Sequence, residues 1–168
     1  MTYNLEITYN LERIDKYTFI SLMLVYFYDV FSSAVLLLKN GVSGLYMLHL
    51  IMVLIGVTVT ITTFAKERGA IICGWMMLLT YLAVHVILML SSAFLYSFVL
   101  AFPLFLLSLG YLNGMLIKIN GIGIGAAAII HCLMCAGRAD KSSVALAVII
   151  IVLSMGYCCK IKDATGMV

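Results

Sequence analysis

Charged residues are scarce in this sequence, and proline is almost absent. Only 10% of the 168 residues are charged and one is proline, whereas 65% are hydrophobic. A soluble domain carries about 25% charged residues, and a chain of this size folded in water would leave too much apolar surface exposed. Disordered chains need more charge, and collagen-like chains need far more proline. The composition therefore excludes these classes and predicts an all-α integral membrane protein.

A strong net charge is also missing. Ten basic and seven acidic residues leave a net charge of +3, which is too small an excess to indicate a nucleic-acid partner. The five cysteines lie mostly inside apolar segments, so a disulfide framework is not expected either. The partner that the composition does predict is the lipid bilayer, and we expect the plasma membrane.

Long hydrophobic runs, in contrast, fill the sequence. A membrane-spanning helix needs about 20 mostly apolar residues. Six runs qualify, which predicts a bundle of six transmembrane helices at 17–38, 45–64, 69–90, 93–112, 121–137 and 143–159. Residues 1–16 then form an N-terminal leader and residues 160–168 a short tail. The fifth run is short unless residues 115–119 extend it into the polar break that we place at 113–120.

Positive charge predicts the orientation of this bundle, because lysine and arginine favour the cytoplasmic side of a membrane. With the N-terminus inside, the cytoplasmic side carries Arg13, Lys16, Lys66, Arg68, Lys118, Lys160 and Lys162. The outer side carries Lys39, Arg138 and Lys141. The larger inner set favours a cytoplasmic location for both termini, although Arg138 and Lys141 go against it.

Four ionisable side chains fall inside the predicted spans, namely Asp29, His49, His85 and His131. Such groups are costly at membrane depth, which makes each of them a candidate functional residue. At about 1.5 Å of rise per residue, the three histidines lie roughly 6–9 Å below the outer boundary and Asp29 about 13 Å below it. In the predicted topology, all four therefore share the outer half of the membrane.

Hydroxyl-bearing residues recur one helical turn from two of these groups. Residues three or four apart share a helix face, which places Tyr26 and Ser33 with Asp29, and Tyr81 with His85. Lipid offers no hydrogen bonds, so we expect these stripes to face the bundle interior and to line a polar pocket open to the outside. A carboxylate beside imidazoles there suits a small cationic or hydrogen-bonding ligand, a response to pH, or a metal.

The alternative for each group is a structural role, in which it hydrogen-bonds a neighbouring helix. A metal site built from the three histidines is not favoured, because no two of them share a helix. We therefore predict a ligand-binding set with no metal and no other cofactor. Its members are Tyr26, Asp29, His49, Tyr81, His85 and His131.

Two further motifs admit a functional or a structural interpretation. Cys132 and Cys135 form a C-x-x-C pair, which is a candidate redox site. A thiol oxidase would need a second outer pair, which is missing, and cysteine also packs as a small hydrophobic residue. We therefore do not expect an enzyme. Pro103 falls in the middle of a span and frees the carbonyl of Val99, which predicts a helix kink that shapes the bundle or acts as a hinge.

Five short segments suggest a relationship to a known family. They are N-L-E-R-I-D-K at 10–16, K-N-G at 39–41, K-E-R at 66–68, F-V-L-A-F-P-L at 98–104 and L-G-Y-L-N at 109–113. With these segments, residues 10–135 resemble the six-helix N-terminal membrane region of certain Firmicute methyl-accepting chemotaxis proteins. The resemblance implies a sensor that signals to a cytoplasmic coiled coil. Only nine residues follow Cys159, so we expect a sensor module without that signalling domain.

We therefore expect a receptor-like membrane sensor for an unknown small molecule, acting as a homo-oligomer or with a partner membrane protein. One alternative is the small substrate-binding subunit of a vitamin transporter, which has a similar size and number of spans. The first helix of those subunits typically shows an A-x-x-x-A pattern, whereas the first span here has one alanine, Ala34. The other alternative is a thiol-redox membrane enzyme that uses Cys132 and Cys135.

Overall fold

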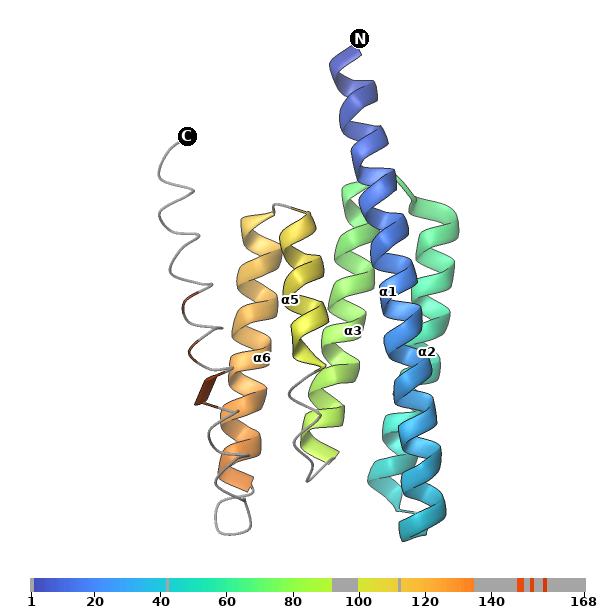
Figure 1. Ribbon diagram of the computed structural model, residues 1–168, viewed down its shortest axis with the longest axis vertical. Coiled ribbons are helices and arrows are strands. Elements are labelled where there is room, and N and C mark those ends of the chain that lie inside the picture. The colour runs from blue at the N-terminus through green and yellow to red at the C-terminus, as the bar shows by residue number, and fades with distance from the viewer. Residues whose placement is uncertain are drawn as a thin grey trace. The chain divides into compact units, whose positions relative to one another are not determined.

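All regular structure in the described part of the chain is α-helical. The computed structural model describes residues 2–41, 43–91, 100–111 and 113–134, together with 148, 149, 152 and 156. The helices are α1 (Thr2–Asn40), α2 (Gly44–Glu67), α3 (Ile71–Ser91), α5 (Ala101–Gly110) and α6 (Gly114–Met134), as Figure 1 shows. The predicted all-α class is confirmed for these residues.

Four stretches of these helices are long and apolar enough to cross a membrane. They are Asn10–Lys39, Tyr46–Glu67, Ile71–Met89 and Gly114–His131, and the shorter helix α5 is also apolar. The protein is therefore a helical membrane protein. Most of the sixth predicted span, 143–159, lies outside the described residues, so a total of six crossings stays a prediction.

The chain divides into two compact units, residues 1–84 and 85–168. The first unit holds α1, α2 and most of α3, and the second holds the end of α3 with α5 and α6. Within the first unit, Gly41 ends α1 in the left-handed conformation, with φ of +76°, and its N–H donates to the carbonyl of Leu37 at 3.0 Å. Gly69 has φ of +88° in the turn between α2 and α3. Both turns fall at the breaks between apolar runs.

The first unit buries an unusual number of polar side chains and exposes many apolar ones. The buried face of α1 repeats every three or four residues, which is the spacing of a helix packed along a neighbour at a shallow angle. Its members are Asp15, Thr18, Leu22, Tyr26, Asp29 and Ser33, of which only Leu22 is aliphatic. The opposite face exposes large apolar side chains, with Leu24, Phe27 and Phe31 each more than 60% exposed. This distribution suits lipid outside and hydrogen-bonding side chains between helices.

Helix α2 presents a matching face to the interior. Its buried positions are His49, Val53, Gly56, Thr60 and Thr63, which again alternate steps of four and three residues. Val53, Gly56 and Thr60 are each about one helical turn apart, so they lie along a single line of the helix. The interior of the first unit thus holds hydroxyl, imidazole and carboxyl groups beside buried apolar side chains such as Leu22, Val53, Met77, Leu78 and Val84.

In the second unit, α6 begins seven residues before the predicted start of the fifth span. The Asn113 side-chain oxygen accepts hydrogen bonds from the backbone N–H groups of Met115 and Leu116, both at 3.1 Å, and so caps the helix. Asn120, which we had assigned to the polar break, is fully buried in α6 and donates to the Ser108 hydroxyl of α5 at 2.7 Å. The expected break at 113–120 is therefore wrong beyond its first residue, because Asn113 caps the helix and Asn120 packs inside it. Residues 115–119 extend the helix, which is the alternative that the sequence left open.

Replacing Asn113 with alanine is expected to lower the free energy of unfolding by about 1 kcal/mol, because two backbone N–H groups lose their acceptor. Asn113→Asp keeps the acceptor and serves as the control, with stability close to that of the wild type. Thermal unfolding in detergent, followed by circular dichroism, measures the difference. Equal losses in the alanine and aspartate variants would contradict the cap.

Candidate functional site

The candidate site begins where Tyr26 of α1 lies against the backbone of α2. A Cβ atom at Gly56 would come within 2.9 Å of the Tyr26 hydroxyl oxygen and 3.0 Å of two carbons of its ring. The absence of a side chain at Gly56 therefore makes room for the tyrosine. Thr60 donates to the Tyr26 hydroxyl at 3.5 Å, and the ring of Tyr81 on α3 meets that of Tyr26 edge to face, with centroids 5.5 Å apart. Three helices thus converge on one aromatic side chain.

Asp29 lies one turn along α1 from this contact, and its carboxyl group has no hydrogen-bond partner among the described residues. Its side chain is 1% exposed, and neither carboxyl oxygen is paired with any atom that the structure describes. Ser32 donates to the main-chain carbonyl of Asp29 at 3.2 Å and so does not pair with its carboxyl group. The carboxyl group is thus buried between helices, and no described residue donates a hydrogen bond to it.

One further turn along α1, Ser33 pairs with His49. The Ser33 hydroxyl lies 2.8 Å from Nδ1 of His49, and both side chains are buried. The other ring nitrogen of His49, Nε2, is buried without a partner in the described part of the chain. Tyr26, Asp29 and Ser33 therefore form one continuous polar stripe. Tyr26 contacts both α2 and α3, Ser33 contacts α2, and the Asp29 carboxyl group has no described hydrogen-bond partner.

The remaining two predicted histidines belong to the second unit. His85 follows Tyr81 by one turn of α3 and is fully buried. His131 on α6 hydrogen-bonds through Nδ1 to the main-chain carbonyl of Met89. The structure therefore brings Tyr26 and Tyr81 into contact in the first unit, with Asp29 buried one turn from Tyr26, and gives His131 a structural partner in the second.

The other predicted motifs receive less support. The side chain of Cys132 and all of Cys135 lie outside the described residues, so the redox pair stays a prediction. Pro103 occupies the first turn of α5, where a missing N–H leaves no helical hydrogen bond unmade. Val99, whose carbonyl the predicted kink would free, is outside the described part. No three histidine, cysteine, aspartate or glutamate side chains within that part are placed to hold a metal ion.

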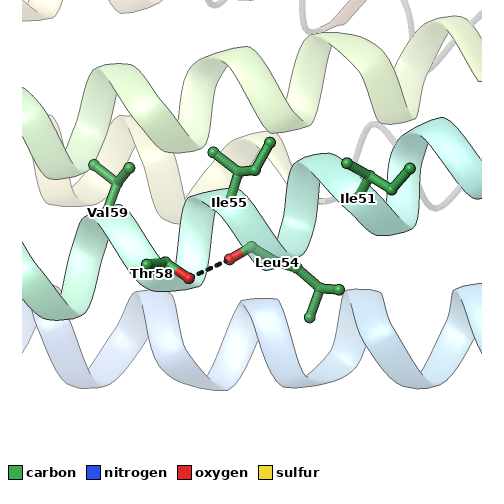
Figure 2. Close-up of a pocket in the computed structure, with 5 residues that line it drawn as sticks. All are labelled: Ile51, Leu54, Ile55, Thr58 and Val59. Carbon is green, nitrogen blue, oxygen red and sulfur yellow. Dashed lines mark hydrogen bonds between the residues drawn. The ribbon is translucent and has the colours of Figure 1, made fainter.

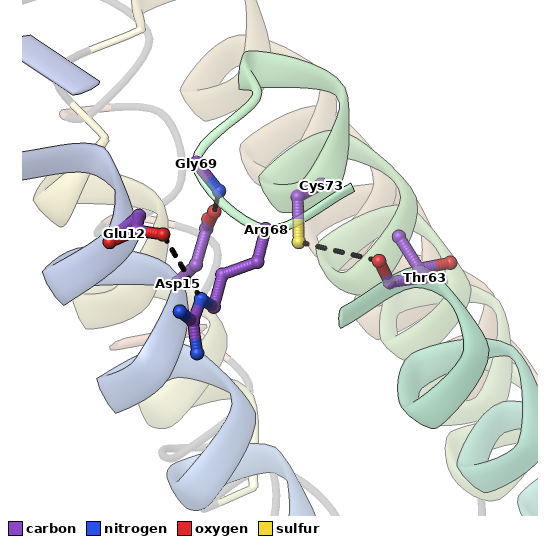
Figure 3. Close-up of polar contacts among 6 residues, drawn as sticks. All are labelled: Glu12, Asp15, Thr63, Arg68, Gly69 and Cys73. Atoms are coloured by element: carbon purple, nitrogen blue, oxygen red, sulfur yellow. Dashed lines mark hydrogen bonds and ion pairs between the residues drawn. The ribbon is translucent and has the colours of Figure 1, made fainter. Parts of the chain in front are cut away.

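The structure adds a polar junction that sequence reasoning missed (Figure 3). Asp15 is fully buried, and its Oδ2 accepts a hydrogen bond from the backbone N–H of Gly69 at 2.8 Å. Beside it, Nε of Arg68 forms an ion pair with Glu12 at 3.2 Å. These contacts fasten the N-terminal part of α1 to the turn between α2 and α3. Asp15 stands two turns before Leu22 and four before Asp29, so the same helix-face spacing was available to identify it.

The chemistry of this site follows from its unpaired acceptor. A buried carboxyl group without a hydrogen-bond donor is unfavourable, and a ligand that supplies an ammonium, N–H or O–H group would remove that penalty. Aromatic rings beside the carboxyl group further favour a cation. No family model, curated protein or solved structure matches this chain.

Proposed function

We propose that this protein is a receptor-like sensor module of the membrane that binds a small ligand through Asp29. The supporting observation is the buried carboxyl group of Asp29, which has no hydrogen-bond donor in the described structure. The ligand class follows from this observation: a small molecule with a positive charge or a hydrogen-bond donor, held between Asp29 and the phenols of Tyr26 and Tyr81. His49 of α2 supplies a further polar atom, Nε2, which is buried without a partner among the described residues.

A sensor also needs a route from the ligand to the rest of the protein, and α1 supplies one. The helix is continuous over its 39 residues, which corresponds to about 58 Å. Asp29 and the junction at Asp15 lie on the same buried face of this helix, about 21 Å apart. A ligand that shifts α1 at Asp29 would therefore act on the contacts of Glu12 and Asp15 with the turn between α2 and α3.

The setting we propose is the one that the sequence predicts. The chain would cross the plasma membrane six times with both termini in the cytoplasm, and a second copy or another membrane protein would receive the signal. The resemblance of residues 10–135 to the membrane region of chemotaxis receptors supports this role. In this proposal the module carries out no catalysis and holds no cofactor.

The proposal is tested by ligand-dependent thermal shifts of the detergent-purified protein. The probes are a panel of small primary, secondary and quaternary amines, with the alcohols of matching carbon skeleton as neutral controls. We expect at least one amine to raise the melting temperature of the wild type and to lose this effect in Asp29→Leu. A shift that survives in Asp29→Leu, or a panel in which no amine acts, would contradict the assignment.

A further inference from the structure

A shallow apolar hollow runs along the outer face of α2, on the side away from the polar interior. It has a volume of about 320 Å³ and is lined by Ile51, Leu54, Ile55, Thr58 and Val59, whose side chains Figure 2 shows. The Thr58 hydroxyl donates to the main-chain carbonyl of Leu54 at 2.9 Å. Because the hydroxyl is satisfied within the helix, this hollow presents hydrocarbon to its surroundings.

A second hollow of about 320 Å³ lies farther along α2, where the helix ends. It is lined by Thr62, Thr63, Lys66 and Glu67 of α2 and by Ile72 and Met76 of α3. Ile55, Val59, Thr62 and Lys66 are spaced by four, three and four residues, so the two hollows share one face of α2. The second hollow differs from the first in that it holds one positive and one negative side chain.

The spacing of these hollows matches one leaflet of a bilayer. Along the helix, Val59 lies about 10 Å and Ile55 about 16 Å from Lys66. Half of a hydrocarbon core is about 15 Å thick, and Lys66 stands at the end of a candidate membrane span, Tyr46–Glu67. The charged hollow therefore falls at the depth of lipid headgroups. The apolar hollow lies at the depth of the acyl chains, and its far end at Ile51 extends about one helical turn beyond the bilayer midplane.

We propose that this face of α2 binds a zwitterionic phospholipid with a primary ammonium group, which is the chemistry of phosphatidylethanolamine. An acyl chain lies along the apolar hollow, the phosphate pairs with Lys66, and the ammonium donates to the carboxylate of Glu67. A quaternary ammonium has no N–H to donate to Glu67, and an anionic headgroup without an amine would leave Glu67 beside like charge. The pair of opposite charges thus selects the headgroup, independently of any ligand at Asp29.

The test measures which lipids stay bound to the full-length protein. The protein is reconstituted into vesicles of equal parts dioleoyl phosphatidylcholine, phosphatidylethanolamine and phosphatidylglycerol, extracted in mild detergent, and analysed by native mass spectrometry. A surface charge pair contributes up to about 1 kcal/mol, so we expect phosphatidylethanolamine to be retained roughly two- to fivefold above its share. Glu67→Gln should abolish its preference over phosphatidylcholine, and Lys66→Ala should lower the retention of all three lipids.

Lys39→Ala removes one lysine at the other end of the helical hairpin and is the matched control, with lipid retention like that of the wild type. All three substitutions are at surface positions, and unchanged melting temperatures verify that the variants are folded. Equal retention of the three lipids, a preference of the wild type for phosphatidylglycerol, or a phosphatidylethanolamine preference that persists in Glu67→Gln would overturn the proposal.

Discussion

Replacing Gly56 with leucine is expected to lower the free energy of unfolding by about 3 kcal/mol, which is the upper range for overpacking a tightly packed contact. The first atom of any side chain at this position would already lie 2.9 Å from the hydroxyl oxygen of Tyr26. The tyrosine has little room to withdraw, because Thr60 and Tyr81 contact it from two other directions. Unfolding in detergent, followed by the loss of helical circular dichroism, gives the size of the effect.

Gly44→Leu is the matched control, because a Cβ atom at Gly44 meets no atom within 4 Å. We expect this substitution to change the stability by less than about 0.5 kcal/mol. A double variant that combines Gly56→Leu with Tyr26→Ala should lose less stability than the sum of the losses of its two single variants. The truncated side chain at position 26 would leave room for the introduced leucine. If Gly56→Leu is tolerated as well as Gly44→Leu, then Tyr26 does not lie against α2 as described.

Much of this architecture could be predicted from composition and spacing. Long apolar runs separated by short polar breaks fix the helices, because a bilayer leaves a backbone few other ways to satisfy its hydrogen bonds. The three- and four-residue steps between Tyr26, Asp29 and Ser33 were enough to place these side chains on one face. Polar residues on a lipid-surrounded helix then have an energetic reason to turn inward, and all three are buried.

The parts that sequence reasoning missed depend on how one helix is aligned against another. The pairing of Ser33 with His49 needs the register between α1 and α2, which no local pattern contains. Gly56 is one of thirteen glycines, and only its position opposite Tyr26 distinguishes it. Asp15 precedes the first apolar run and therefore falls in the predicted N-terminal leader, although the structure buries it against Gly69.

Replacing Asp29 with leucine is expected to raise the free energy of unfolding of the ligand-free protein by about 1–3 kcal/mol. The substitution removes a buried carboxyl group that has no described hydrogen-bond partner and replaces it with an apolar side chain. Binding residues often lower the stability of the empty protein, because groups that await a ligand are left unsatisfied. The same variant should lose its response to the amine panel.

Ser33→Ala is the informative comparison, because Ser33 lies one turn from Asp29 and its hydroxyl does have a partner. Removing that hydroxyl leaves Nδ1 of His49 buried without its hydrogen bond, and we expect a loss of about 1 kcal/mol. Asp29→Leu should therefore raise the free energy of unfolding and Ser33→Ala should lower it, although both replace a polar side chain of the same stripe with an apolar one.

The unfolding free energy of Asp29→Leu, measured in protein freed of bound small molecules, tests most directly whether Asp29 is a binding group kept at the expense of stability. We predict a variant more stable than the wild type, beside a less stable Ser33→Ala. A variant that instead loses about 1 kcal/mol or more would mean that the carboxyl group of Asp29 is already satisfied within the protein, and would contradict its role as the ligand site.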